Sequence, residues 1–226
     1  MAYTYSTFVT ALAAALTVDQ SDSDFVALLP TIIDDAEQRI YRELDLVSAS
    51  VISNATMVVG SRYLTLPTTD GHIVVIDAIN IVDSNTRYPL KPATLDVIDY
   101  IWPSNTALTG IKPQLFYRLD DNRVIVAPVP GFTWSVEIVG TIRPLPLTSS
   151  NGATFLTTYL SDLFFAATMI SASGTLLKNY GAQSEDPQQA QAWESQYQVR
   201  LASAKSEELR KLFISNNSPL PASVKA

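Results

Sequence analysis

The sequence predicts an α+β fold, in which N- and C-terminal helices form a helical bundle with an inserted antiparallel β-rich domain and a flexible C-terminal arm. Apolar residues recur every three or four positions near both ends of the chain, while the middle is rich in short β-branched runs. The predicted boundaries are residues 1–48 for the N-terminal helices, 49–150 for the β-rich domain, 151–212 for the C-terminal helices and 213–226 for the arm.

Two helices are predicted at the N-terminus. The longer one begins near Phe25, with Ser23 or Asp24 as its cap, and carries an apolar face as far as Leu44. Pro30 falls within its first turns, where proline is tolerated. A shorter helix precedes it and ends near the polar segment 19–24. Its apolar residues are Phe8, Val9, Leu12, Ala13 and Leu16.

Strands and hairpins are predicted from residue 62 to residue 146. Residues 63–66 and 73–82 are strand-like, and a tip at 83–86 returns the chain through 87–90. A second hairpin turns at 120–122, and the alternating segment 134–143 indicates a half-exposed antiparallel strand that Pro144 and Pro146 end. Residues 94–102 predict a short helix, which Thr94 caps and Pro103 terminates.

Helical spacing returns in the last third of the chain. Residues 155–179 predict one mainly buried helix. Asp186 and Pro187 are suited to the cap and first position of a final, more polar helix, in which Trp193, Tyr197 and Leu201 lie on one face. The segment 213–226 lacks periodicity and contains two prolines, so we expect a flexible arm there.

Composition excludes several function classes. The 226 residues contain no cysteine, which rules out disulfides, thiolate nucleophiles and cysteine-ligated metals. A formal net charge of −7 without any basic run argues against broad binding of the phosphate backbone of DNA. The first basic residue is Arg39, so a secretory signal is not expected, and no apolar run is long enough for a membrane span.

Residue counts also argue against catalysis. His72 is the one histidine of the sequence, and it lies in a predicted turn before a strand without a motif that would supply a partner. Phosphate-binding glycine motifs and the nucleophile-elbow motif are missing from the sequence. We therefore predict no catalytic residues, no cofactor and no metal.

The charged residues from Asp34 to Glu43 raise the question of a catalytic site. Asp35, Arg39 and Glu43 are spaced by four, so they form one stripe in which a cation lies between two carboxylates. A carboxyl group that acts as a general acid needs a raised pKa, whereas a neighbouring cation lowers the pKa of a carboxyl group. The stripe is interpreted as a scaffold or subunit-interface ion-pair row. Glu43 lies near the centre of the apolar face, so it needs a partner in Arg39 or in another subunit.

The order and spacing of turn and strand-end residues from about Phe25 to Leu212 resembles the head-to-tail adaptor (connector) proteins of tailed phages, of the tail tubular protein A type found in short-tailed phages. The residues that carry the resemblance are Pro67, Pro89, Leu90, Trp102, Pro103, Gly110, Pro113, Pro128, Pro130, Arg143 and Pro144.

This resemblance implies a structural virion protein at the head-tail junction, made in the host cytoplasm. Its copies would form a dodecameric ring that binds the portal protein at one end and the tail nozzle protein at the other. DNA would pass through the channel only as cargo, and no membrane would be involved. An acidic protein suits this role because a basic lumen would retain the DNA.

The C-terminal segment is the predicted portal-binding element, because a solvated arm has little reason to carry consecutive large apolar side chains. The alternative is that these side chains cover the protein's own helical core. The candidate portal-binding residues are Leu209, Leu212, Phe213, Ile214, Pro219 and Leu220.

Two other function classes remain open from the residues alone. A carbohydrate-binding or virion-decoration β module would present exposed aromatic side chains on a strand face, for which Tyr88, Tyr117 and Trp134 are candidates. A hydrolase would need a cleft that contains carboxyl groups with perturbed pKa values. Neither class accounts for the helices on both sides of the strands.

Overall fold

The computed structural model describes residues 2–173 and 187–216, and it divides into two compact units. The helical unit comprises residues 1–47 and 146–226, and the β unit comprises residues 48–145, inserted between the two helical segments of the sequence. The fold is therefore mixed α+β, as predicted. The finer domain boundaries, the bundle arrangement and the flexible arm remain predictions.

The N-terminal helices form where the apolar spacing predicts them. Helix α1 spans Tyr5–Leu16 and α2 spans Ser23–Glu43. The cap of α2 is Asp22, one residue before Ser23 and two before Asp24, the two predicted caps, because its carboxylate accepts the amide protons of both Asp24 and Phe25. This earlier start places the exposed Pro30 inside the helix rather than in its first turns.

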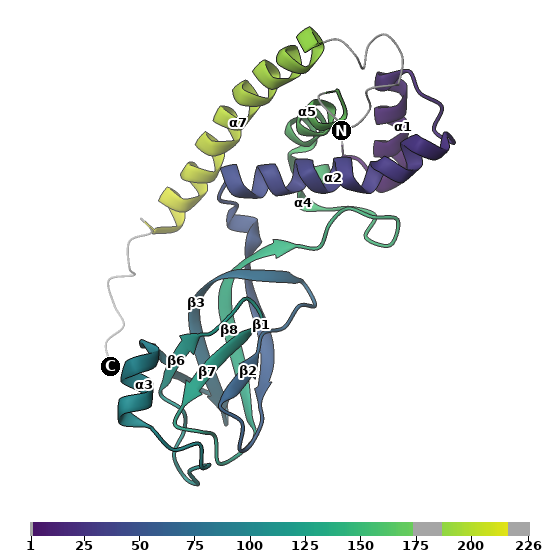
Figure 1. The fold of residues 1–226 in the computed structure, drawn as a ribbon. Coiled ribbons are helices and arrows are strands. Elements are labelled where there is room, and N and C mark those ends of the chain that lie inside the picture. Colours follow the sequence, from purple (N-terminus) through teal and green to yellow (C-terminus); the bar gives the residue numbers. More distant parts are fainter. Residues whose placement is uncertain (1, 174–186, 217–226) are drawn as a thin grey trace. The chain divides into compact units, whose positions relative to one another are not determined.

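The C-terminal half of the helical unit contains α4 (Phe155–Tyr159), α5 (Ser161–Ser171) and α7 (Pro187–Asn216) (Figure 1). The single helix predicted from residue 155 is wrong, because the backbone leaves helical geometry at Leu160, whose ψ is 35°. Thr154 caps α4 through a reciprocal pair of bonds with Thr157. Helix α5 packs against both α2 and α7, and Phe8, Phe25, Phe164 and Tyr197 are fully buried in this unit.

Helix α7 overlaps the start of the predicted arm. It continues to Asn216, so residues 213–216 are helical where the arm was expected to begin. The rest of the predicted arm, together with Pro219 and Leu220, lies outside the described residues. The same is true of Asp186, the predicted cap of this helix.

The β unit contains two four-stranded sheets (Figure 1). The first has the order β1-β8-β3-β4, in which all neighbours are antiparallel, and the second has the order β2-β7-β6-β5, in which only the short β5–β6 pair is parallel. The strands are β1 (Ser50–Met57), β2 (Tyr63–Thr65), β3 (Gly71–Asp83), β4 (Thr86–Pro89), β5 (Lys91–Pro92), β6 (Leu115–Arg118), β7 (Arg123–Ala127) and β8 (Trp134–Pro144).

One apolar core joins the inner faces of the two sheets. It includes Ile79 and Ile138 from the first sheet and Leu64, Phe116 and Val124 from the second. Helix α3 (Leu95–Ile101) covers the opposite face of the second sheet, where its Ile98 contacts residues of β7. The arrangement is a two-layer sandwich with a helix on one outer face.

Local signals locate most of these strands. The turn between β3 and β4 has Ser84 and Asn85 in the left-handed region, with φ values of 49° and 64°, as a tight hairpin with the usual strand twist requires. Strand β8 alternates as predicted, and Gly140 in its middle lies so close to β3 that an added Cβ would be 2.2 Å from the carbonyl oxygen of Val75.

No helix among the described residues has the length and apolar character that a membrane span requires.

Candidate interaction sites

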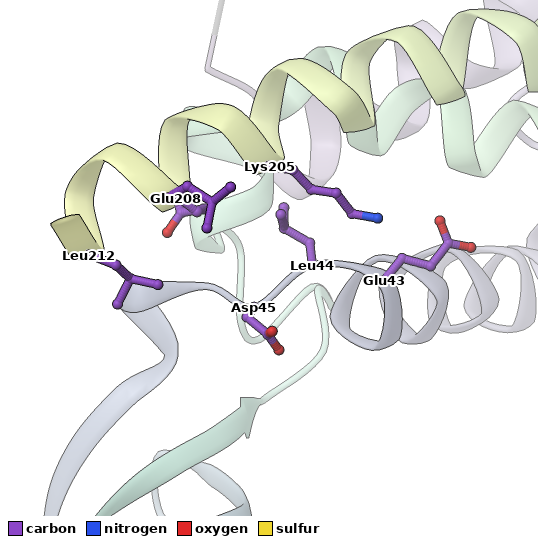
Figure 2. Close-up of a pocket in the computed structure, with 7 residues that line it drawn as sticks. Glu43, Leu44, Asp45, Lys205, Glu208 and Leu212 are labelled. Atoms are coloured by element: carbon purple, nitrogen blue, oxygen red, sulfur yellow. The ribbon is translucent and has the colours of Figure 1, made fainter.

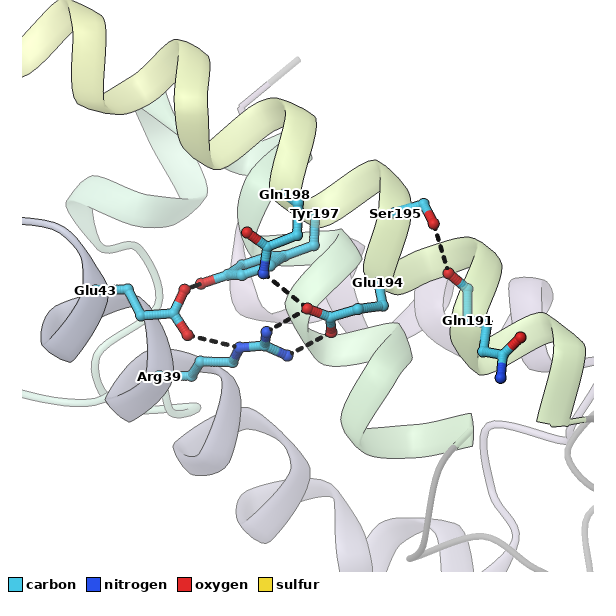
Figure 3. A network of polar contacts seen from close by, with 7 residues as sticks. All are labelled: Arg39, Glu43, Gln191, Glu194, Ser195, Tyr197 and Gln198. Carbon is cyan, nitrogen blue, oxygen red and sulfur yellow. Dashed lines mark hydrogen bonds and ion pairs between the residues drawn. The ribbon is translucent and has the colours of Figure 1, made fainter.

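An ion-pair cluster joins α2 to α7 within the helical unit (Figure 3). Arg39 donates through both terminal nitrogens to the carboxylate of Glu194, at 2.8 and 2.6 Å, and through Nε to Glu43 at 3.1 Å. Its guanidinium lies 4.2 Å from the centre of the Tyr197 ring. The Tyr197 hydroxyl donates to the second oxygen of Glu43 at 3.0 Å. Arg39 therefore connects the two helices through two carboxylates and one aromatic face.

The electrostatics of this cluster favour fixed protonation states. Hydrogen bonds from Arg39 hold the pKa of Glu194 below its usual value, and hydrogen bonds to Glu194 raise the pKa of Arg39. Burial, together with the hydrogen bond to Glu43, raises the pKa of the Tyr197 hydroxyl. Arg39 and Glu194 therefore stay charged and Tyr197 stays neutral near neutral pH, which suits a structural contact and not a proton-transfer site.

Asp35 does not join this cluster, although its spacing predicts that it would pair with Arg39. Its carboxylate instead accepts a hydrogen bond of 3.3 Å from the hydroxyl of Ser171, on α5. The predicted row is thus divided between two contacts. Arg39 and Glu43 bind α7, and Asp35 binds α5.

Two buried carboxylates hold the chain at the two ends of the inserted segment: Glu208 binds it where it leaves the helical unit, and Glu37 binds it where it returns. Glu37 on α2 accepts the amide proton of Leu147 at 3.1 and 3.3 Å, and Glu208 on α7 accepts that of Val47 at 2.9 Å. Each side chain belongs to a residue that is 3% exposed. Burial raises the pKa of Glu37 to about 7, whereas Glu208 also binds Lys211 at 2.7 Å.

Sequence reasoning missed these carboxylates, yet a signal for Glu37 exists. It follows Ile33 by four residues and precedes Ile40 by three, so it lies on the apolar face of the helix. A carboxylate at such a position requires a buried donor. Its raised pKa resembles that of a general acid, but its carboxylate is buried and already accepts the backbone amide of Leu147.

The last turns of α7 present large apolar side chains to solvent. Leu209, Leu212 and Phe213 are 66%, 40% and 69% exposed, whereas Leu201 and Ala204, nearer the middle of the helix, are buried. The side chain of Ile214 lies outside the described part of the structure. These three side chains are therefore exposed and lie outside the buried core of the unit.

A cleft of about 330 Å³ lies beside this exposed end (Figure 2). Its walls are Leu209 and Leu212 of α7 and the segment that follows α2, and buried Leu44 is part of its lining. Figure 2 shows Lys205 extending from α7 toward the end of α2. The remaining lining residues are Glu43, Asp45 and Glu208.

The candidate aromatic residues of the β unit do not form an open sugar-binding face. Tyr117 packs with the cluster beneath α3, and Trp134 packs partly buried against the sheet core. Tyr88 is 40% exposed, but the Lys112 ammonium lies 3.4 Å from its ring centre. These positions disfavour the carbohydrate-binding alternative.

His72 lies at the start of strand β3, opposite Arg143, rather than in the preceding turn as predicted. It is half-buried. Within residues 2–173 and 187–216, no group of three or more histidine, aspartate or glutamate residues is arranged to hold a metal ion.

The family described as SU10 adaptor protein matches residues 3–219, which is nearly the whole chain. A comparison with curated proteins finds no match.

Proposed function

This chain belongs to the SU10 adaptor protein family, and on that premise we propose that it is a head-to-tail adaptor, whose copies form a dodecameric ring between the portal protein and the tail nozzle protein. Its family confirms the predicted resemblance to phage adaptors and indicates a structural protein of the virion. The ring, its position at the head-tail junction and its partners are our proposal.

The contacts of the helical unit support a structural and non-enzymatic role. Arg39, Glu43 and Glu194 neutralise one another within one chain, and Glu37 and Glu208 each accept a backbone amide. Such groups hold the helices and the segments around residues 47 and 147 in place, and these four carboxylates are engaged in contacts within the chain. We propose that the row from Asp35 to Glu43 is a scaffold contact.

DNA is proposed to pass through the ring as cargo. The protein has 22 acidic and 15 basic side chains, so its formal net charge is −7. An acidic protein releases few counterions from DNA and binds it weakly, which suits a channel through which the DNA must move. The same acidity disfavours an alternative role in DNA recognition.

The portal-binding surface is proposed to be the exposed cluster of Leu209, Leu212 and Phe213 at the end of α7. This is the observation that carries the docking proposal, because three large apolar side chains on an otherwise polar helix leave apolar area in water. Burying one such side chain in a partner contributes about 1.5 to 3 kcal/mol before ordering costs. Pro219 and Leu220 lie beyond the described residues, and this proposal does not depend on them.

Replacing Phe213 by serine tests the docking proposal. Phe213 is 69% exposed, so the variant should melt like the unsubstituted protein but bind the cognate portal about 10- to 100-fold more weakly. Val199→Ser is the matched control, because Val199 lies on the same helix and is 73% exposed. A large fall in the melting temperature of Phe213→Ser, with portal binding retained, would show that Phe213 supports the fold and not the docking.

A further inference from the structure

A second pocket of the helical unit has a chemistry different from that of the cleft at the end of α7. It measures about 240 Å³ and is lined by Tyr3, Ser161, Asp162, Phe165, Trp193 and Arg200. We call it the aromatic pocket. Its residues come from the N-terminal segment, from α5 and from the first half of α7.

Three rings form one side of the aromatic pocket, and their neighbours hold them in place. Phe165 stacks on Tyr3 with ring centres 6.3 Å apart and meets Trp193 edge to face at 6.0 Å. Buried Phe8 packs against the Phe165 ring, 6.0 Å away. The backbone amide of Tyr3 donates to the carbonyl of Thr157 at 2.9 Å, which anchors the N-terminal segment. The rings are therefore a preformed apolar surface.

The rim of the aromatic pocket carries an exposed carboxylate. Asp162 has a side chain that is 67% exposed, and its nearest cation is Arg200, whose Nε lies 3.7 Å away. Arg200 also donates to the backbone carbonyl of Asp162 at 3.1 Å, so its guanidinium is shared with the backbone. The Asp162 carboxylate can accept a further cation from solvent or from a partner.

The size of the pocket suits side chains of a peptide. Pockets for drug-sized ligands measure roughly 300 to 1,000 Å³, and this one is smaller. Aromatic-lined grooves recognise proline-rich segments, because the polyproline II conformation is already ordered and presents flat apolar rings. A basic residue near the prolines would match Asp162.

This chain contains such a segment in its own C-terminal residues. Residues 217–226 read NSPLPASVKA, in which Pro219, Leu220 and Pro221 precede Lys225, the one charged side chain of the segment. We propose that residues 217–226 of one copy bind the aromatic pocket of a second copy, with the prolines on the three rings and Lys225 beside Asp162.

The geometry of α7 requires a second copy. Figure 1 shows α7 as one continuous helix, and at 1.5 Å of rise per residue Asn216 lies about 34 Å from Trp193 and about 24 Å from Arg200. Pro221 follows Asn216 by five residues and can extend at most about 17 Å from it. The prolines therefore cannot reach the pocket of their own chain.

This inference assigns Pro219 and Leu220 to a contact between copies and leaves Leu209, Leu212 and Phe213 to the portal. A single such contact is weak, with a dissociation constant on the order of 0.1 to 1 mM, but a closed ring repeats it at every interface. The inference concerns self-association, so it stands or falls independently of portal binding.

The direct test is titration of the full-length protein into a fluorescein-labelled peptide of residues 217–226, followed by fluorescence anisotropy. We expect saturable binding that Trp193→Ala weakens at least tenfold, whereas Val199→Ala, on the same helix, leaves it unchanged. A scrambled peptide should bind at least tenfold more weakly. Binding of the scrambled peptide with equal affinity, or no binding at millimolar protein, would overturn the proposal.

A second test exchanges the charges of Asp162 and Lys225, so it does not depend on whether the Trp193 variant folds. Asp162 is exposed, so Asp162→Lys should fold and should weaken the peptide severalfold by repelling Lys225. A peptide with Lys225→Glu should recover the lost affinity on this variant and bind the unsubstituted protein more weakly. Failure of this recovery would remove Lys225 and Asp162 from the contact.

Deletion of residues 217–226 separates this proposal from the docking proposal. At protein concentrations on the order of 0.1 to 1 mM, near the expected dissociation constant, the unsubstituted protein should self-associate in sedimentation velocity and the shortened chain should not, while the shortened chain binds the portal with normal affinity. Unchanged self-association would contradict the inference, and lost portal binding would assign the segment to the portal instead.

Discussion

Replacing Arg39 by alanine removes the side chain that holds α2 against α7. The substitution abolishes the bidentate pair with Glu194, the bond to Glu43 and the contact with the Tyr197 ring. It also leaves Glu43 and Glu194 on facing helices without the cation that lies between them. Arg42→Ala is the matched control, because Arg42 lies one turn away on the same helix and is exposed, with Gln38 as its hydrogen-bond partner.

The expected loss follows from partial exposure of the cluster. The side chains of Arg39, Glu43 and Glu194 are 29%, 32% and 39% exposed, so each ion pair is worth about 0.2 to 1 kcal/mol and not the larger value of a buried pair. The contact of the guanidinium with the Tyr197 ring adds about 0.5 to 1 kcal/mol. We expect Arg39→Ala to lower the free energy of unfolding of the helical unit by about 2 kcal/mol, and Arg42→Ala by less than about 0.5 kcal/mol.

Urea denaturation followed by far-UV circular dichroism measures this loss. With a slope of about 1 to 3 kcal/mol per molar urea, the helical transition should shift by about 1 M for Arg39→Ala. A double-mutant cycle with Glu194→Ala should give a coupling energy of about 1 kcal/mol. Equal midpoints for Arg39→Ala and Arg42→Ala, or a coupling energy near zero, would refute the scaffold role of the cluster.

Two further perturbations address the buried carboxylate of α2 and the centre of the first sheet. Burial raises the pKa of Glu37 to about 7 from its ordinary 4.5. Between these pH values the folded chain holds a proton on Glu37 that the unfolded chain has lost. The free energy of unfolding should therefore fall by on the order of 3 kcal/mol as the pH rises from 5 to 8. Denaturation at both pH values should show this fall in the unsubstituted protein and not in Glu37→Gln, and an equal fall in both would contradict it. Gly140→Ala should destabilise the β unit by about 2 kcal/mol or more, because the new Cβ would meet the carbonyl oxygen of Val75 at 2.2 Å. Gly152→Ala, where no atom lies within 4 Å, is its control, and equal melting of the two variants would show that β3 can move aside.

Local patterns were sufficient for most elements of this fold. The apolar spacing of α2, the turn between β3 and β4 and the alternation in β8 are each determined by neighbours in sequence. Strand β1 was missed, because Ile52 is 62% exposed and the strand therefore lacks a clear alternation of apolar and polar residues. The strand conformation of residues 50–57 depends on pairing with β8, which lies far away in the sequence.

The ion-pair cluster around Arg39 was predictable only where the paired residues are close in sequence. The pair Arg39–Glu43 follows from a spacing of four on a helix, but Glu194 lies 155 residues from Arg39 and no local signal connects them. The break at Leu160 also escaped prediction, because residues on both sides of it have high helical character. Tertiary packing selects such partners and breaks, and it is not encoded in any short window.

Electron microscopy of the protein mixed with its cognate portal tests the adaptor proposal most directly. We predict a ring of additional density on one end of the portal, with twelvefold symmetry and an open central channel. Phe213→Ser should leave most portals without this ring. Portals that remain bare at protein concentrations well above micromolar, or that bind single copies at scattered positions, would contradict the proposed function.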